Sequence, residues 1–122
     1  MNIKFNNSLI EQLIMDLLDI SNNKKIILKY VDSEIARMIK KRIDYFGAAP
    51  NFYWCIINPI GHFEALSGDF MHKYSIRLNQ NYRLIIRPDL NNFSMEELKK
   101  CESYYIEGVV DYYGSKKNWI IP

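Results

Sequence analysis

The segment Lys73–Arg87 constrains the fold most, because charged and apolar residues alternate in it on both sides of a short polar stretch. Alternation with a period of two is typical of β-strands that bury one face. The polar stretch, Asn79–Asn81, favours a turn between two strands, because asparagine tolerates the left-handed backbone conformation that such turns need. The segment therefore predicts an antiparallel β-hairpin.

The length of the turn decides which side chains share a face of this hairpin. A two-residue turn pairs Leu78 with Arg83 and mixes charged with apolar side chains on each face. A three-residue turn pairs Leu78 with Tyr82 and separates the two kinds of side chain, so we predict that register. Its apolar face consists of Tyr74, Ile76, Leu78, Tyr82, Leu84 and Ile86.

The other face of the predicted hairpin carries four cations. It consists of Lys73, Ser75, Arg77, Arg83, Ile85 and Arg87. Like charges that lie directly opposite each other destabilise a sheet, so Arg77 opposite Arg83 requires a compensating anion. That anion is either a carboxylate of the protein or a bound phosphate. The pattern also fits a plain solvent-exposed face of a half-buried sheet, and the residues alone leave these alternatives open.

Two amphipathic segments precede the hairpin. Ser8 begins a capping-box pattern, and apolar residues then repeat at helical spacing to about 21–23. Asp32 is a suitable N-cap for a second helix, which we expect to run to about Phe46. Residues 24–30, between them, fit either the start of a helix or an extended chain. The two helices favour an antiparallel helical hairpin.

From residue 59 the spacing of apolar residues changes to that of strands. We expect a short first strand at 2–5 and further strands at about 60–66, 72–78, 82–87 and 104–112. Residues 88–103 interrupt these strands as an atypical insertion with one short helix. Helices followed by strands predict an α+β fold in one domain, 1–122, with two N-terminal helices packed on a twisted antiparallel sheet of four to five strands.

The overall composition narrows the class of protein. The net charge is only +2, so a nucleic-acid site must come from local clusters of basic residues. Cys55 and Cys101 form no disulfide framework and indicate reduced thiols in a cytoplasmic protein. No apolar run approaches the roughly 20 residues of a membrane span, and no signal-peptide pattern is present, so we expect no membrane association. Cysteine and histidine lack metal-ligand spacing, and we expect neither metal nor cofactor.

Several runs of residues resemble the motifs of a known family. Leu66–Asp69, Tyr74–Asn79 and Tyr82–Ile85 resemble the L-x-G-D, YSIRIN and YRLIF motifs of HigB-like plasmid maintenance killer proteins, in the RelE/ParE toxin superfamily. Val110–Tyr112 resembles the start of their C-terminal V-D-Y-H motif. The resemblance covers most of the chain, but it is absent in 88–103 and after residue 114. It implies a RelE-like fold.

The resemblance also implies a function, that of the toxin in a type II toxin–antitoxin system. Such toxins are ribosome-dependent endoribonucleases that cut mRNA and so inhibit translation. The implied partners are a cognate helix-turn-helix antitoxin, the ribosome and mRNA, with operator DNA reached only through the antitoxin. The alternative is a non-nuclease or degenerate member that acts by binding protein, namely the antitoxin and, as in ParE-like relatives, DNA gyrase.

RNA cleavage of this kind needs a base for the 2′-OH, an acid for the leaving oxygen and cations for the charged transition state. The resemblance places Arg83 at the scissile phosphate and Tyr112 where an aromatic ring stacks on a base. Arginine suits phosphate because its guanidinium group binds two oxygens at once. The further RNA- and phosphate-binding residues that we expect are Lys73, Arg77, Arg87 and Asp111.

The proton-transfer residues depart from the family pattern. Tyr113 stands where the last motif usually has histidine, and Glu64 stands where some members have another histidine. His62 precedes Glu64 by two residues and shares its face if the strand is regular. We therefore expect Glu64 or His62 as the base and Tyr113 as the acid or a stacking group. A free tyrosine, with a pKa of about 10, is a poor base at neutral pH, so phosphate binding is better supported than proton transfer.

Two basic clusters outside the hairpin each fit two interpretations. The tail that contains Lys117 and Trp119 is either a terminal strand with the tryptophan docked on the protein or a contact for the ribosome or antitoxin. The run Lys40–Arg42 is either a solvated helix face or a contact for ribosomal RNA. Neither choice can be made from residue types alone.

Overall fold

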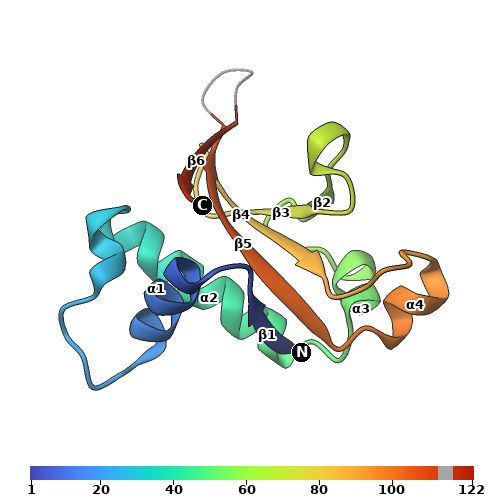
Figure 1. Ribbon diagram of the computed structural model, residues 1–122, viewed down its shortest axis with the longest axis horizontal. Helices are drawn as coiled ribbons and strands as arrows, with labels where there is room; N and C mark the ends of the chain where they lie inside the picture. The colour runs from blue at the N-terminus through green and yellow to red at the C-terminus, as the bar shows by residue number, and fades with distance from the viewer. Residues whose placement is uncertain (113–116) are drawn as a thin grey trace.

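The computed structural model, which describes residues 1–112 and 117–122, has an α+β fold with helices on one side of a sheet (Figure 1). Helices α1 (Ser8–Leu18) and α2 (Ser33–Ala48) supply much of the buried apolar core. Both were expected from the sequence. None of the helices in the described part of the chain is long and apolar enough to cross a membrane.

The first helix differs from the expectation at both ends. Asn7, rather than Ser8, is the N-cap, since its side-chain oxygen accepts the backbone N–H of Ile10 at 3.0 Å. The helix ends before Asp19, whose carboxylate accepts the N–H of Ser21 and so competes with continued helical pairing. The ambiguous stretch that follows contains the 3₁₀ helix η1 (Ile26–Lys29).

The second helix begins as predicted and ends slightly later. The Asp32 side chain accepts the N–H of Ile35 at 2.9 Å, which satisfies one of the free donors at the helix start. The helix continues two residues past Phe46, to Ala48. A third helix, α3 (Phe52–Ile57), was not expected, because its apolar run is too short to show a helical period.

In the described part of the chain the sheet has six strands, one more than the expected upper limit. They are β1 (Asn2–Phe5), β2 (Glu64–Ala65), β3 (Tyr74–Arg77), β4 (Tyr82–Pro88), β5 (Ser103–Asp111) and β6 (Asn118–Ile121). The order is β1-β5-β4-β3-β2, with β6 also paired to β5. Since β1 runs parallel to β5, the sheet is mixed, and the expectation of a purely antiparallel sheet was wrong. A long connection between β1 and β5 permits the parallel pairing.

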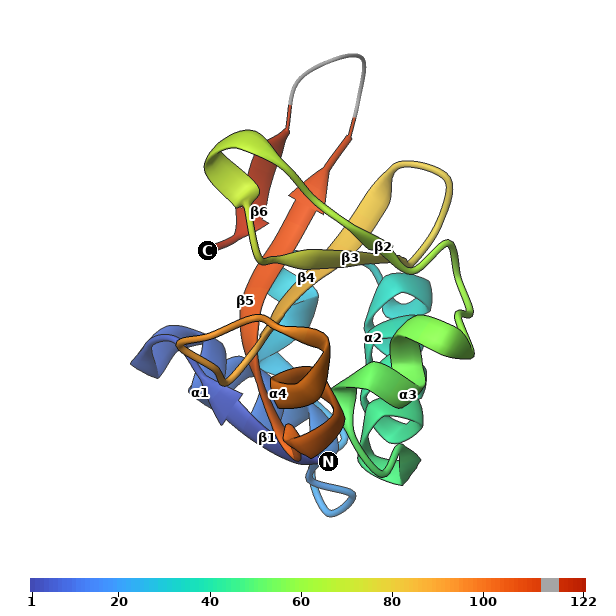
Figure 2. The same cartoon turned by 90° about the vertical axis from the view of Figure 1, so that its right-hand side faces the viewer.

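The edge strand β2 is much shorter than the predicted 60–66. Gly61 and His62 adopt positive φ angles of 56° and 52°, and this turns the chain before Glu64. The insertion 88–103 contains α4 (Met95–Lys100), capped by Ser94 as its sequence indicates. Helices α3 and α4 pack against each other beside the sheet (Figure 2).

The hairpin of β3 and β4 has the predicted register. Tyr74 lies opposite Ile86 and Arg77 opposite Arg83, and the Leu78 N–H donates to the Tyr82 carbonyl at 2.9 Å. The core side chains of this face are completely buried, as the alternation predicts. They include Ile76, Leu84 and Ile86.

Candidate nucleic-acid interface

The cationic face of the hairpin lies on the side of the sheet opposite the helical core. The register places Arg77, Arg83 and Val110 in one row across β3, β4 and β5. In the neighbouring row Ser75 lies opposite Ile85. Ser75, Ile85 and Val110 are 0 % exposed, so of the alternatives left open by the sequence, a plain solvent-exposed face does not describe this surface. Strand β6 pairs with β5, and Phe70 of η2 (Gly68–Phe70) stacks on Trp119 of β6. These contacts involve segments outside the hairpin, so alternation in the hairpin does not reveal them.

Arg77 and Arg83 form the centre of this face, and no carboxylate of residues 1–112 or 117–122 forms an ion pair with either. Arg83 is only 9 % exposed. Within residues 1–112 and 117–122, Nε and Nη1 of Arg83 and Nε of Arg77 are buried without a hydrogen-bond partner, and neither arginine forms an ion pair. An unsatisfied buried donor costs about 1–3 kcal/mol, and more when it is charged. The sheet thus presents donors that an anion would satisfy.

Ser75 and Tyr112 add two hydroxyl groups to the same region. Among the described residues, Ser75 Oγ and Tyr112 Oη are likewise buried without a hydrogen-bond partner. The Tyr112 ring lies 5.2 Å from Cζ of Arg83, a cation–π distance, and its backbone N–H donates to the Asn81 carbonyl at 2.8 Å. The turn of the hairpin therefore helps to hold the tyrosine beside Arg83.

Arg42 supports this face from α2. Its Nε donates to the carbonyl of Arg77 at 3.0 Å, and burial lowers the pKa of its guanidinium group. The guanidinium also fills the space above Gly61, where a Cβ atom would come within 2.6 Å of Arg42 Nη2. The run Lys40–Arg42 was interpreted either as a solvated helix face or as a contact for ribosomal RNA. Arg42 fits neither interpretation, because its side chain connects α2 to the sheet.

Lys73 and Arg87 were predicted to join the arginine pair as phosphate-binding cations, but in the structure both form ion pairs with Glu107. Glu107 is buried, and its Oε1 accepts the Arg87 Nε–H at 2.8 Å and lies 3.4 Å from Lys73 Nζ. A β-bulge allows this contact. Ile85 lies opposite Gly108 and Ile86 lies opposite Ile106, so Glu107 is the extra residue of the bulge. Sequence reasoning missed Glu107; a glycine after it, inside a strand pattern, was the available signal of a bulge.

We expect Glu107→Gln to lower the free energy of unfolding by about 1–3 kcal/mol, because it leaves Lys73 and Arg87 without their shared counter-charge. Urea denaturation measures the change. Glu102→Gln is the matched control, since Glu102 is exposed just before the same strand, and we expect less than about 0.5 kcal/mol there. Equal values for the two variants would show that the Glu107 ion pairs contribute nothing.

Of the remaining residues that were predicted for the site and that the structure describes, only Glu64 lies on the cationic face. Glu64 is exposed on β2 opposite Ser75 and so shares the cationic face. His62 lies in the turn before β2, so the regular strand that would align it with Glu64 is absent. Asp111 lies opposite Tyr82 and therefore on the helix-facing side, away from Arg83. Tyr113 lies outside the described residues.

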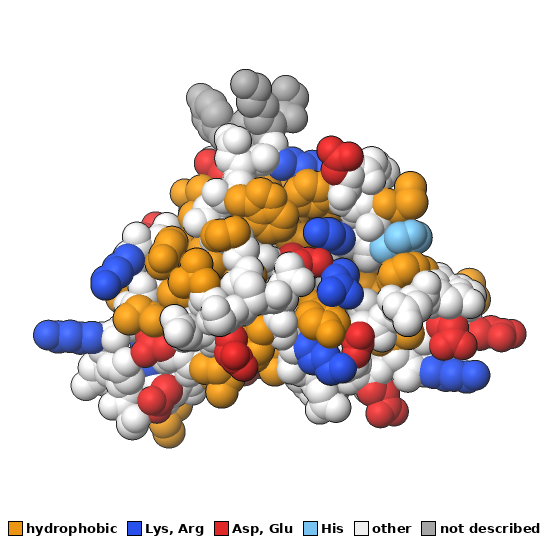
Figure 3. Space-filling model, in the orientation of Figure 1, with side chains coloured by type: hydrophobic (Ala, Val, Ile, Leu, Met, Phe, Trp, Pro, Cys, Tyr) orange, Lys and Arg blue, Asp and Glu red, His pale blue; other side chains and the backbone are white. Residues whose placement is uncertain are grey.

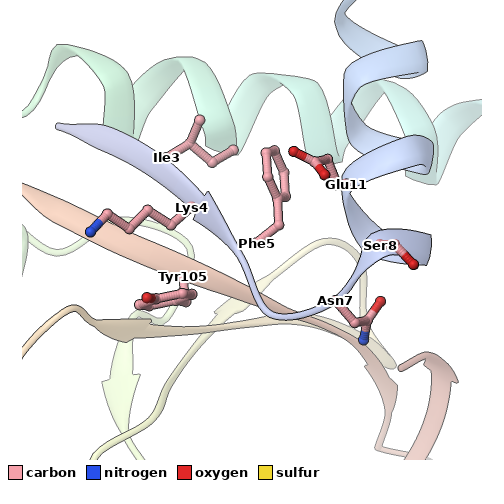
Figure 4. Close-up of a pocket in the computed structure, with 7 residues that line it drawn as sticks. All are labelled: Ile3, Lys4, Phe5, Asn7, Ser8, Glu11 and Tyr105. Atoms are coloured by element: carbon pink, nitrogen blue, oxygen red, sulfur yellow. The ribbon is translucent and has the colours of Figure 1, made fainter.

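A separate pocket of about 570 Å³ opens beside β1 (Figure 4). It is lined by Ile3, Lys4, Phe5, Asn7, Ser8, Glu11 and Tyr105. Phe5 and Glu11 lie on one side of the strand and Lys4 and Tyr105 on the other, so its charged groups do not converge. Lys4 is also paired with Asp89. The arginine pair, rather than this pocket, is the candidate site.

A match to known proteins is found in the three-dimensional structure and not in the sequence. No protein-family model and no curated protein matches the sequence. The structure is similar to a YoeB/ParE toxin from Agrobacterium tumefaciens, with a TM-score of 0.50 and 14% identity over 87% of this chain and 92% of that one. It is also similar to the YoeB-YefM complex from Staphylococcus aureus, with a TM-score of 0.53 and 17% identity over 93% and 98%. The chain therefore has a YoeB/ParE-like toxin fold, as the RelE/ParE resemblance predicted.

Proposed function

We propose that this chain is the HigB-like toxin of a type II toxin–antitoxin system and cuts mRNA on the ribosome. The Arg77–Arg83 pair is the observation that carries the proposal, because Nε of half-buried Arg77 and Nε and Nη1 of buried Arg83 lack a hydrogen-bond partner among the described residues. A phosphodiester supplies oxygens that match the fork of N–H donors on arginine. The YoeB/ParE-like fold supports the same assignment.

The proposed reaction transfers the phosphoryl group within the RNA, from the 5′-oxygen of one nucleotide to the 2′-oxygen of the nucleotide before it. The 2′-oxygen forms a bond to the adjacent phosphorus while the bond to the 5′-oxygen breaks, which leaves a 2′,3′-cyclic phosphate and a 5′-hydroxyl. Arg83 and Arg77 stabilise the negative charge that grows on the phosphate oxygens. These guanidinium groups supply the positive charge, so the proposal uses no metal or cofactor.

Two protons must move in this reaction, one from the 2′-OH and one to the 5′-oxygen. Glu64 is the proposed base, since its exposed carboxylate lies on the cationic face opposite Ser75. His62 is the second choice, and Tyr113 is the proposed acid. Tyr112 would stack on a base beside the scissile phosphate. Lys73 and Arg87 are proposed as outer RNA contacts, whereas Asp111, on the other side of the sheet, is not.

The proposed partners follow from this function. One solved structure of the same fold is described as a YoeB-YefM complex, which supports a cognate protein partner for this chain. We propose a helix-turn-helix antitoxin that neutralises the toxin and carries the pair to operator DNA. The ribosome and mRNA are the targets of the free toxin.

Induced expression followed by mapping of mRNA 5′ ends tests the proposal. We expect growth arrest and new 5′ ends confined to translated frames, and we expect Arg83→Ala to remove both. Arg37→Ala is the matched control, because Arg37 is exposed on α2 away from the cationic face, and it should leave the cuts in place. Intact mRNA with DNA-damage signalling would favour a gyrase-binding toxin, and normal growth would overturn the toxin assignment.

A further inference from the structure

An aromatic pair on the outer side of the sheet extends the candidate site. Phe70 of η2 and Trp119 of β6 stack with ring centroids 5.5 Å apart and planes 17° from parallel. We call these two residues the aromatic platform. Trp119 is 40 % exposed, so part of its ring is accessible to a ligand. Figure 3 shows hydrophobic side chains gathered over β5 and β6 with Lys and Arg side chains beside them.

The fold fixes the platform beside the arginine pair. Trp119 lies opposite Val110, and Val110 lies opposite Arg83, so the tryptophan extends the same cross-strand row. Gly108 allows β6 to lie this close, because a Cβ atom there would be 1.9 Å from the Ile121 carbonyl oxygen and 3.0 Å from Cζ3 of Trp119. Backbone packing of β6 on β5 thus sets the position of Trp119.

Cations surround the platform and lead back to Arg83. Lys73 Nζ lies 5.5 Å from the Phe70 ring and 5.9 Å from the Trp119 ring. Lys117 Nζ lies 4.8 Å from the Phe70 ring and 5.6 Å from that of Tyr112, which itself contacts Arg83. Rings and cations therefore alternate across the face. Proteins that bind single-stranded nucleic acid combine these features, with aromatic rings for bases and cations for the backbone.

We propose that the aromatic platform binds a nucleobase of single-stranded RNA whose neighbouring phosphate lies at Arg77 and Arg83. This inference rests on the proposed function and adds a base-binding position to it, supplied by a tail that the killer-toxin motifs do not cover. Unpaired bases expose both ring faces, which double-stranded RNA does not, so the platform selects single strands. Lys73 and Lys117 contact the negatively charged backbone on either side of that base.

Trp119 itself reports binding, since the chain has only two tryptophans. In a Trp54→Phe background Trp119 is the sole tryptophan. The probe is a short 2′-O-methylated RNA, which lacks the free nucleophile and cannot be cut. We expect saturable quenching of Trp119 fluorescence by this RNA and none by an abasic oligomer of the same length. Quenching that is absent while RNA binds, or equal with the abasic oligomer, would overturn the platform.

Substitution separates stacking from simple covering of the sheet. We expect Trp119→Leu to weaken RNA binding by about 5- to 140-fold and to leave abasic binding unchanged, because stacking contributes roughly 1–3 kcal/mol per base. Trp119→Phe, which keeps a ring and guards against loss of folding, should retain most of the affinity. Trp54→Leu, the matched control, should match the wild type. Equal RNA affinity in Trp119→Leu would overturn the inference.

The two proposals fail differently. Arg83→Ala should weaken binding of both the RNA and the abasic oligomer, since the arginine contacts phosphate. Quenching by RNA without mRNA cuts in cells would sink the proposed cleavage and support the platform. If mRNA is cut in cells but RNA does not quench Trp119, the cleavage proposal stands and the base-binding proposal is overturned. Phe70 and Trp119 would then only cover the sheet.

Discussion

Arg83→Leu should give a protein that is inactive yet more stable than the wild type. Arg83 is only 9 % exposed, and two of its guanidinium nitrogens lack a hydrogen-bond partner among the described residues. Leucine removes the buried charge and its repulsion with Arg77 while keeping apolar volume next to Val110. We expect the free energy of unfolding to rise by about 1–3 kcal/mol and the melting temperature by roughly 3–10 °C.

The same variant should lose mRNA cleavage by at least about 100-fold, because a positioned donor to the transition state is absent. Thermal denaturation and cleavage of ribosome-bound mRNA measure the two effects. Inorganic phosphate should stabilise the wild type and not Arg83→Leu, since only the wild type has the binding group. Arg37→Leu is the control for loss of a surface arginine and should change stability by less than about 0.5 kcal/mol. If Arg83→Leu were less stable than Arg37→Leu, the proposal that Arg83 carries a buried charge without a partner would be wrong.

Gly108→Ala should destabilise the protein by more than about 3 kcal/mol, the largest expected effect of a single methyl group in this chain. The φ angle of Gly108 is +148°, where side chains are strained, and the new Cβ would be 1.9 Å from a backbone oxygen of Ile121. Strand β6 must then separate from β5. Urea denaturation measures the loss, and exposure of Trp119 should shift its fluorescence to longer wavelength.

Gly47→Ala is the matched control for this prediction. Gly47 lies within α2, and nothing lies within 4 Å of a Cβ atom built there. Alanine there should raise stability by about 0.5–1 kcal/mol, because glycine loses more conformational freedom in a helix. Opposite signs for the two substitutions are the expected result. A small effect at Gly108 would show that β6 is not held against β5.

The sequence by itself determined the elements whose signals are local. Alternation on either side of Asn79–Asn81 permits one register that separates charge from apolar bulk, and the structure has that register. Helical spacing and the Asp32 cap likewise predicted α2. The opposition of Arg77 to Arg83, the centre of the candidate site, follows directly from this local pattern. Short-range spacing is enough in these cases because the paired residues are close in the chain.

Tertiary structure alone decided what surrounds that pair. A one-residue bulge aims Glu107 at Lys73 and Arg87, and so neutralises two of the four predicted cations. Return of the tail along β5 places Trp119 in the row of Arg83. Both effects depend on contacts between segments distant in sequence and on shifts of a single residue, which local periodicity does not encode. The hairpin's register was therefore readable from its residues, but the burial and the counter-charges of its cations were not.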